Sequence, residues 1–370
     1  MMAAKGLENI VMGDSAISFV GGETGELVYR GYPIQELAGH VSYESVVHLL
    51  LFGDLPSTDP PEDLRRALAL QRAVPPELDQ VIEALPRGLP PLEAMRTLVS
   101  AMGDGSVTYP PTIEQGYALI GRTPSLLARY VRHSQGAAPV EPRQDQSYAE
   151  NYLYQLTGQV PGPDQLRALE SYLILLADHG MNASTLALRV VISTNSDLMS
   201  AATAALAALK GPAHGGAPSK VSDMLDAIGR PEEAERWIAD ALAKRERLMG
   251  FGHRAYKVED PRAVVLKTIA RRVARPDRFA LAERVEAVAL DALHRERPGQ
   301  RLYTNVEFYG AVVLEAVGLT RDLFTPTFAL GRTAGWVAHA LEQSKDNRLI
   351  RPDVRYVGPP KGRSRPPAAT

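Results

Sequence analysis

A predicted helix stops abruptly in the stretch Lys210-Gly211-Pro212-Ala213-His214-Gly215-Gly216-Ala217. The run before it, Asp197 to Leu209, is mostly Ala, Leu, Met, Ser and Thr, and it predicts a helix with its N-cap among residues 195–197. A Gly-Pro pair then ends this helix, and the two glycines after His214 leave room for backbone or a ligand beside the imidazole. Taken alone, the stretch fits a plain helix-terminating loop as well as a functional site, so its meaning depends on the rest of the chain.

Length and composition favour a protein with a sizeable core and small-molecule partners. The chain has 370 residues, 45% of them apolar, which is enough for two domains. The 41 Lys and Arg residues nearly balance the 43 Asp and Glu residues, so no whole-chain field attracts nucleic acid or a membrane surface. The absence of Cys excludes disulfides, thiolate metal sites and a cysteine nucleophile.

The N-terminal residues show no targeting pattern. Met1 to Asp14 lacks a basic patch followed by an apolar core, and no apolar run in the chain approaches the length of about 18 residues that a membrane helix needs. We therefore expect a soluble, cytoplasmic protein.

The chain predicts a mostly α fold with one small β-hairpin near its start. Ala16 to Val20 and Glu26 to Tyr29 alternate around a glycine-bearing turn, Gly21 to Gly25. From Ile34 onward the apolar period is helical. The clearest runs are Tyr43–Leu51, Pro61–Gln71, Pro91–Met102, Thr112–Arg132, Tyr148–Leu156 and Pro163–Leu176. The Pro-rich tail, 358–370, cannot bury apolar surface and is expected to be disordered.

A histidine also lies in the break between two helices at Asp178–Thr185, where Asn182 or Ser184 is a candidate N-cap. A lone histidine such as His179 is more often a hydrogen-bonded structural residue than a ligand-binding one.

The segment Leu248–Arg262 contains more residues of the types found in functional sites than the segments before it. It places His253 beside glycines, and it starts a helix at Asp260 and Pro261, so that Arg262 falls in the first turn of a helix reaching about Ala274. A helix N-terminus with a guanidinium suits a carboxylate or phosphate, although a glycine loop with surface cations is the plainer interpretation. The Gly-x-Gly is no dinucleotide fingerprint, because no βαβ unit surrounds it and the third glycine is missing.

Two helices near the C-terminus carry further candidates. Glu307 lies in the first turn of a predicted helix, Val306 to Val317, where acids are common for dipole reasons alone, but where the dipole would also keep a base ionised. The stretch Gly331–His339 is expected to begin a helix with Arg332 at its start, and Arg351 follows it. Both arginines are candidate carboxylate clamps, whereas His339 is interpreted as structural.

Together these segments resemble the citrate synthase family, from Tyr29-Arg30-Gly31-Tyr32 to Arg351-Pro352. The specific feature is the order of the motifs Asp178–Thr185, Lys210–Ala217, Gly250-Phe251-Gly252-His253-Arg254, Asp260-Pro261-Arg262 and Arg332-Thr333-Ala334-Gly335-Trp336. The resemblance implies an all-α enzyme that forms a homodimer or a higher homo-oligomer. It also implies a large domain built from residues 1–215 and 319–357 and a small domain, 216–318, on the acyl-CoA side of the cleft.

The resemblance implies condensation of an acyl-CoA, normally acetyl-CoA, with oxaloacetate and then thioester hydrolysis. Glu307 would remove the α-proton, His214 would stabilise the enolate, and His253 would polarise the ketone. The remaining residues would bind the two substrates. Those for oxaloacetate are His179, Arg262, Arg332 and, from the partner subunit, Arg351; those for CoA are Leu248, Met249, Gly250, Phe251, Gly252 and Lys257. No metal and no permanently bound cofactor is expected, since the CoA thioester is a co-substrate.

Two positions depart from the family pattern. Glu307 replaces the usual aspartate, and Pro218-Ser219 replaces the usual Asn-Glu. One extra methylene moves a carboxylate by about 1 Å, which can cost about 100-fold in rate unless the site adapts. Two alternatives therefore stay open: a 2-methylcitrate synthase that uses propionyl-CoA, and a weakly active regulatory paralogue that binds CoA or oxaloacetate.

Overall fold

The computed structural model describes residues 5–7, 10–103, 105–215 and 218–359. In this part of the chain the protein is mainly helical, with a single small sheet. No helix in these ranges is long and apolar enough to cross a bilayer.

The sheet is an antiparallel hairpin with one short added strand. Strands β1 (Ser18–Gly21) and β2 (Glu26–Tyr29) pair in the register Ser18 to Tyr29, and β3 (Tyr32–Pro33) pairs with β2. The predicted hairpin is thus confirmed, with β1 displaced toward the turn. The two-residue strand β3 is too short to produce an alternating pattern in the sequence.

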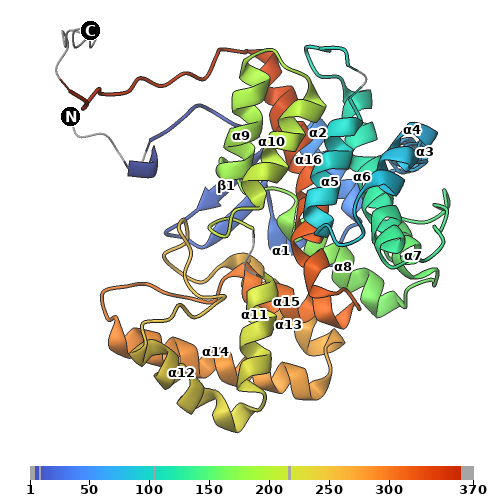
Figure 1. The fold of residues 1–370 in the computed structure, drawn as a ribbon. Coiled ribbons are helices and arrows are strands. Elements are labelled where there is room, and N and C mark those ends of the chain that lie inside the picture. Colours follow the sequence, from blue (N-terminus) through green and yellow to red (C-terminus); the bar gives the residue numbers. More distant parts are fainter. Residues whose placement is uncertain (1–4, 8–9, 104, 216–217, 360–370) are drawn as a thin grey trace, which may run out of the picture.

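The helices form two groups (Figure 1). The larger group comprises α2 (Tyr43–Phe52), α3 (Glu62–Leu70), α4 (Pro76–Ala84), α5 (Pro91–Ala101), α6 (Ile113–Ser134), α7 (Tyr148–Thr157), α8 (Pro163–Leu176), α9 (Ala183–Ser193), α10 (Leu198–Leu209) and α16 (Phe324–Lys345), with the single turn α1 (Ile34–Leu37) after the sheet. The group at the bottom of Figure 1 comprises α11 (Pro218–Ile228), α12 (Ala234–Ala243), α13 (Pro261–Val273), α14 (Pro276–Glu296) and α15 (Val306–Ala316). The described residues also contain the 3₁₀ turns η1 (Lys5–Leu7), η2 (Pro231–Glu233) and η3 (Arg321–Leu323).

Several helices begin where the sequence places a cap. The side chain of Asn182 accepts from the amides of Ser184 and Thr185 at the start of α9, and Asp197 accepts from Ser200 at the start of α10. Asp260 caps α13 in the same way. These contacts satisfy amide groups that a helix leaves unpaired, so polar loop residues fix the helix starts around the site.

Helix α16 (Phe324–Lys345) corrects one expectation. Arg332 was expected at the start of a helix, but it lies in the middle of α16, which packs on α2, α6, α8, α9 and α10. Gly331 is not a break: a Cβ there would lie 2.9 Å from the Leu173 carbonyl oxygen, and one on Gly335 would lie 2.3 Å from that of Ala177. The glycines thus allow α16 to approach α8 closely, and this brings Arg332 into the interior.

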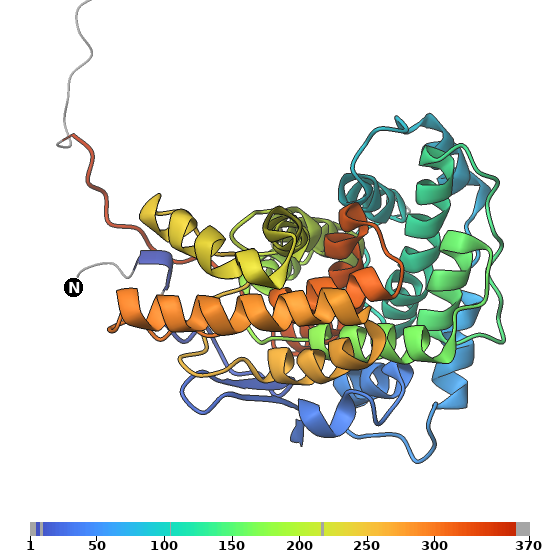
Figure 2. The ribbon, with the colours of Figure 1, turned by 90° about the horizontal axis from the view of Figure 1, so that it is seen from below.

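The C-terminal segment after α16 leaves the body of the molecule. Residues 346–359 have no regular secondary structure and are almost all exposed, and both views show them extending away from the helices (Figures 1 and 2). Residues 360–370 of the tail that was expected to be disordered lie outside the described residues.

Candidate active site

Two of the predicted histidines meet between the end of α8 and the loop before α13. The rings of His179 and His253 have centroids 5.3 Å apart, and Tyr256 contacts both, with its hydroxyl 3.1 Å from His179 Nε2. Burial, together with the nearby charges of Arg262 and Arg332, holds the pKa of His179 well below its usual range. The site therefore presents neutral imidazoles.

The hydrogen bonds of His253 fix its tautomer. Its Nδ1 accepts from the backbone N–H groups of Ala255 and Tyr256, at 3.0 and 3.1 Å. Burial, reinforced by Arg262, lowers the pKa of His253 to about 4, so the ring is neutral at pH 7. Its single proton is then on Nε2, which lies 3.4 Å from Arg262 Nη2. Two donors side by side leave room for a shared acceptor, such as a ligand oxygen.

Arg262 is held rigidly by the residue that caps its helix. Asp260 accepts from Arg262 Nε at 3.0 Å and from Nη2 at 2.8 Å, and both side chains are buried. The same carboxylate accepts from the backbone N–H of Val306 at 3.1 Å. Asp260 therefore links the start of α13 to the start of α15 and holds the guanidinium in a defined orientation.

Arg332 is a buried cation with an unused donor. Its Nε donates to the Leu176 carbonyl oxygen at 2.6 Å, and the guanidinium lies 5.0 Å from the centroid of the Phe328 ring. Its buried Nη1 has no acceptor among the described residues. A buried guanidinium N–H without an acceptor is costly, which favours an anionic ligand as its partner.

His214 also has a fixed tautomer. Its Nε2 lies 3.3 Å from the backbone nitrogen of Ser184 and 2.9 Å from the Ser184 hydroxyl. Because the amide can only donate, Nε2 accepts and the ring proton is on Nδ1. Burial is the main cause that lowers the pKa of His214 to about 4. The ring is thus a neutral donor, held by the start of α9.

Glu307 lies in the first turn of α15 as expected, but its ionisation differs from the expectation. Burial raises the pKa of its carboxyl group to about 8, although Arg262 and Arg332 act in the opposite direction. Within the described chain, no side chain or amide donates a hydrogen bond to this carboxylate. The helix terminus was expected to keep it ionised, and this expectation is wrong because the loss of solvation is the larger effect.

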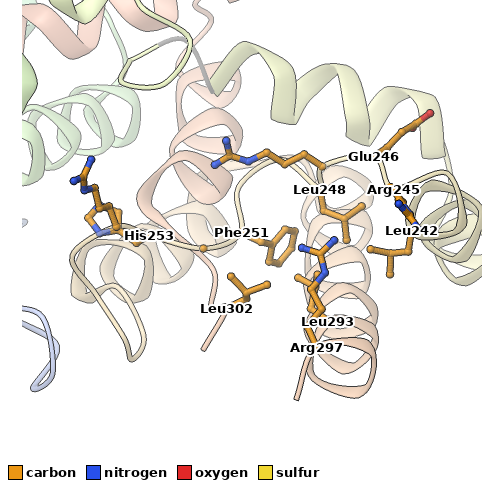
Figure 3. Close-up of a pocket in the computed structure, with 12 residues that line it drawn as sticks. Leu242, Arg245, Glu246, Leu248, Phe251, His253, Leu293, Arg297 and Leu302 are labelled. Atoms are coloured by element: carbon orange, nitrogen blue, oxygen red, sulfur yellow. The ribbon is translucent and has the colours of Figure 1, made fainter. Parts of the chain in front are cut away.

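A cavity of about 420 Å³ lies beside His253 (Figure 3). Its walls come from the end of α12, the 245–254 loop, the end of α14 and Leu302. Leu248, Phe251 and Gly252, three of the residues expected to bind CoA, line it. Met249, Gly250 and Lys257 do not; a Cβ on Gly250 would lie 2.8 Å from Phe308, so this glycine serves the packing of the loop on α15.

The structure brings most predicted residues together and leaves one apart. Arg262, His253, Arg332 and His214 all lie close enough to His179 to lower its pKa, and Lys257 lowers the pKa of His253 in the same way. Arg351 instead lies in the extended C-terminal segment with its side chain 77% exposed, and its nearest acidic partner, Asp353, is 3.9 Å away. His339 bridges Asp178 Oδ1, at 3.1 Å, and the Arg189 guanidinium, in keeping with its structural interpretation.

Sequence reasoning missed the supporting roles of Tyr256, Asp260 and Ser184. Asp260 was recognised only as a helix start, although an acid two residues before an arginine is also a signal for an ion pair. Nothing local in the sequence predicts that Ser184 contacts His214, because Ser184 lies in the first turn of α9 and His214 lies 30 residues later, in the loop after α10.

Comparison with known proteins gives a consistent result over nearly the whole chain. A family model described as citrate synthase, C-terminal domain, matches residues 6–353. Citrate synthase 2 of Bacillus subtilis is 40% identical over 98% of this chain and 97% of its own length. Citrate synthase of Haloferax volcanii is also 40% identical, over 96% and 95%.

Solved structures agree with this match. Citrate synthase from Thermotoga maritima superimposes with a TM-score of 0.89 at 36% identity, covering 99% of this chain and 98% of that one. A ternary complex of the Thermoplasma acidophilum citrate synthase with carboxymethyl coenzyme A and oxaloacetate gives a TM-score of 0.90 at 31% identity, covering 99% of both chains.

Proposed function

Because the chain belongs to the citrate synthase family, we propose a role for each site residue in the reaction of that family. The protein is an enzyme that condenses acetyl-CoA with oxaloacetate and hydrolyses the resulting thioester to citrate and CoA, a step of the tricarboxylic acid cycle. The observation that carries the residue assignments is the buried Nη1 of Arg332, which has no acceptor in the described chain.

Oxaloacetate binds between the two arginines and the two histidines. Its carboxylates accept from Arg262 and Arg332, and its ketone oxygen accepts from the Nε2 proton of His253. That proton is available because two backbone amides occupy Nδ1. A neutral donor polarises the carbonyl carbon for attack without transferring a full charge to it.

His214 and Glu307 act on the acyl group. Glu307 removes the α-proton of acetyl-CoA, and the Nδ1 proton of His214 stabilises the enolate oxygen. A base with a pKa near 8 has a driving force for proton abstraction, while part of it is ionised at neutral pH. Attack of the enolate carbon on the polarised ketone then forms the carbon–carbon bond.

The CoA moiety occupies the cavity beside His253. Four arginines, which form no salt bridge in the described chain, line it together with apolar side chains: Arg245, Arg247, Arg254 and Arg297. In Figure 3, Phe251 lies in the middle of the cavity, with His253 at one end and Arg245 near the other. Cations around an apolar pocket suit the phosphates and the base of a nucleotide.

The two helix groups correspond to two domains that close over the substrates. The proposed small domain, 216–318, contains α11 to α15. Its second boundary, Gly318, has φ of 90° and an open environment, which suits a hinge. The first boundary, Gly216, lies outside the described residues.

The protein works as a homodimer or higher homo-oligomer with shared sites. Arg351 is exposed on a segment that leaves the body of its own chain, which suits an arginine donated to a partner subunit. No permanently bound cofactor takes part in the proposed reaction, because the thioester itself supplies the reactive carbon.

Release of free CoA from acetyl-CoA tests the function directly. We expect release by the purified protein only when oxaloacetate is also present, with citrate formed in equal amount. Parallel assays with propionyl-CoA measure the acyl preference. The assignment would be contradicted if CoA release did not depend on oxaloacetate, or if no citrate were formed.

A further inference from the structure

The N-terminal hairpin contacts both loops that carry the oxaloacetate histidines. Ser18, at the start of β1, donates a hydrogen bond to the Asp178 carboxylate and accepts one from the Gly180 amide at 3.1 Å. These are the two chain neighbours of His179. The first strand thus ties down the loop of one histidine from both sides.

The glycine turn of the hairpin lies against the loop of the other histidine. The Lys257 amide donates to the Gly22 carbonyl oxygen at 2.8 Å. A Cβ on Gly22 would lie 2.5 Å from the Ala255 carbonyl oxygen. A Cβ on Gly25 would lie 2.9 Å from Val258 Cγ2 and 3.2 Å from the Glu259 carbonyl oxygen. The turn can therefore approach this loop only because it carries no side chains there.

The backbone that touches the turn is the same backbone that orients His253. The amides of Ala255 and Tyr256 donate to His253 Nδ1 and so select the tautomer with a proton on Nε2. Ordinary van der Waals contact begins at about 3.4 Å, so a methyl group on Gly22 would displace the carbonyl of Ala255 by about 1 Å. A displacement of that size moves the donors to His253 as well.

We propose that the turn Gly21–Gly25 is a positioning element for oxaloacetate, with Gly22 and Gly25 as positioning residues. The hairpin clamps the loops of His179 and His253 together, and its side-chain-free surface sets the direction of the His253 Nε2 proton. This inference rests on the proposed role of His253. It adds that the turn, more than 200 residues before His253 in the chain, determines through its contacts with the histidine loops how well oxaloacetate is bound and polarised.

The first test compares Gly22→Ala with Gly88→Ala. Neither glycine has a left-handed φ, so alanine strains the backbone at neither position, and no atom lies within 4 Å of a Cβ on Gly88. We expect Gly22→Ala to lower kcat/KM for oxaloacetate by about 10- to 100-fold, as a misplacement near 1 Å can. The KM for acetyl-CoA and the melting temperature should stay close to those of Gly88→Ala. Equal oxaloacetate kinetics in the two variants would overturn the proposal.

The second test uses Gly25 and a rescue. Gly25→Ala and Gly31→Ala place alanine at φ of 71° and 94°, so both variants carry the strain of a left-handed alanine. Only Gly25 lies against the loop of His253. We expect Gly25→Ala alone to raise the KM for oxaloacetate, and Val258→Ala to restore it in the double variant by removing the nearest clash. An equal rise in Gly31→Ala, or no recovery in the double variant, would mean that the hairpin acts only on stability and would overturn the proposal.

His253→Ala, measured alongside, separates this inference from the proposed function. If His253→Ala leaves oxaloacetate kinetics unchanged, the proposed role of His253 is wrong, and so is the proposed positioning role of the turn. If His253→Ala abolishes turnover while Gly22→Ala matches its control, only the positioning role is wrong.

Discussion

The carboxyl group of Glu307 lies in two opposing environments. The start of α15 and the guanidinium groups of Arg262 and Arg332 favour its charge, whereas burial opposes it and raises its pKa to about 8. With a pKa of about 8, this carboxyl is mainly protonated at pH 7. The acid is poised to change its protonation state within the working range of the enzyme.

Replacing Glu307 by glutamine tests its role as the base. We expect Glu307→Gln to lower kcat by about 100- to 10,000-fold and to abolish deuterium exchange into the acyl α-carbon, since that exchange isolates the proton transfer. Near-normal exchange in a folded variant would exclude Glu307 as the base. Glu307→Asp, which shortens the side chain, is also expected to lose activity if the site has adapted to glutamate.

The same pKa predicts how the rate changes with pH. Because the ionised form is the base, kcat/KM for acetyl-CoA should rise with pH and level off above about 8. Glu307→Asp should shift the pH at which kcat/KM rises. A conservative change away from the site, such as Arg271→Lys, should not. A rate that is independent of pH between 6 and 9 would contradict the raised pKa.

Stability should show the opposite dependence. The folded pKa is raised above the ordinary value of 4.5, so the folded state holds this proton more tightly, and ionisation destabilises it as pH rises from about 4.5 to about 8. Glutamine cannot ionise, so the Glu307→Gln variant does not lose stability in this way. The melting temperature of Glu307→Gln relative to the wild type should therefore increase across this window, as differential scanning calorimetry can measure, and a constant difference would contradict the pKa shift.

At the scale of elements, the start of α15 and the 245–254 loop, which lines the proposed CoA cavity, are joined by hydrogen bonds from one residue, Asn305. Asn305 caps α15 by accepting from the Glu307 amide at 3.0 Å. Its side-chain amide donates to the Gly252 carbonyl oxygen at 2.9 Å, and its backbone N–H donates to that of Gly250 at the same distance. The residue that caps the helix of the proposed base thus also holds the loop that lines the proposed CoA cavity.

Asn305→Ala should therefore affect both stability and catalysis. Loss of the cap costs about 1 kcal/mol, which lowers the melting temperature by a few degrees. We also expect a higher KM for acetyl-CoA and a lower kcat. The matched control is Asp197→Ala, which removes the cap of α10. If kcat and KM are as close to normal in Asn305→Ala as in the control, Asn305 is only a helix cap.

The elements that the sequence predicts well are those with strong local signals. Helices α2, α3, α5, α6, α7 and α8 begin and end within two residues of their predicted bounds, and the caps of α9, α10 and α13 lie where polar residues precede apolar runs. The start of α16 was missed because Gly331 resembles a helix break, although it serves close packing against α8.

The parts of the site that escaped prediction depend on contacts distant in sequence. The tautomer of His214 depends on Ser184, 30 residues earlier in the chain, and the ionisation of Glu307 depends on how deeply α15 is buried. Neither property is encoded in a local pattern. The sequence motifs did, by contrast, single out His214 and Glu307 themselves as candidate site residues.

At the scale of the whole molecule, the proposed closure of the two helix groups predicts an order of binding. An enolate must be protected from water, and the proposed CoA cavity adjoins the His253 loop that oxaloacetate would engage. We expect oxaloacetate to bind first and to tighten the binding of an unreactive acyl-CoA analogue. Calorimetric titration with and without oxaloacetate measures this, and equal affinities would contradict ordered closure.

The role of Arg351 also depends on the whole assembly, because this residue is proposed to act in the site of another subunit. Its side chain is 77% exposed on a segment that extends from the body, so in its own chain it contributes nothing visible to the cluster around His179. Arg351→Ala and His214→Ala should each be inactive. In a mixed dimer, one site then combines the intact His214 of the first chain with the intact Arg351 of the second.

Mixing the two inactive variants under conditions of subunit exchange should therefore restore activity. With random pairing, half of the dimers are mixed and half of their sites are intact, so recovery should approach about a quarter of wild-type activity. The matched control mixes His214→Ala with His253→Ala; both residues lie on the same chain's side of the site, so every hybrid site keeps a lesion and no activity returns. If mixed dimers form, as separation of differently tagged chains would show, and the Arg351→Ala mixture stays inactive, then Arg351 does not act across the interface. Recovery in the first mixture alone would require a site built from two chains, and it would explain why an exposed arginine on an extended arm belongs to the chemistry.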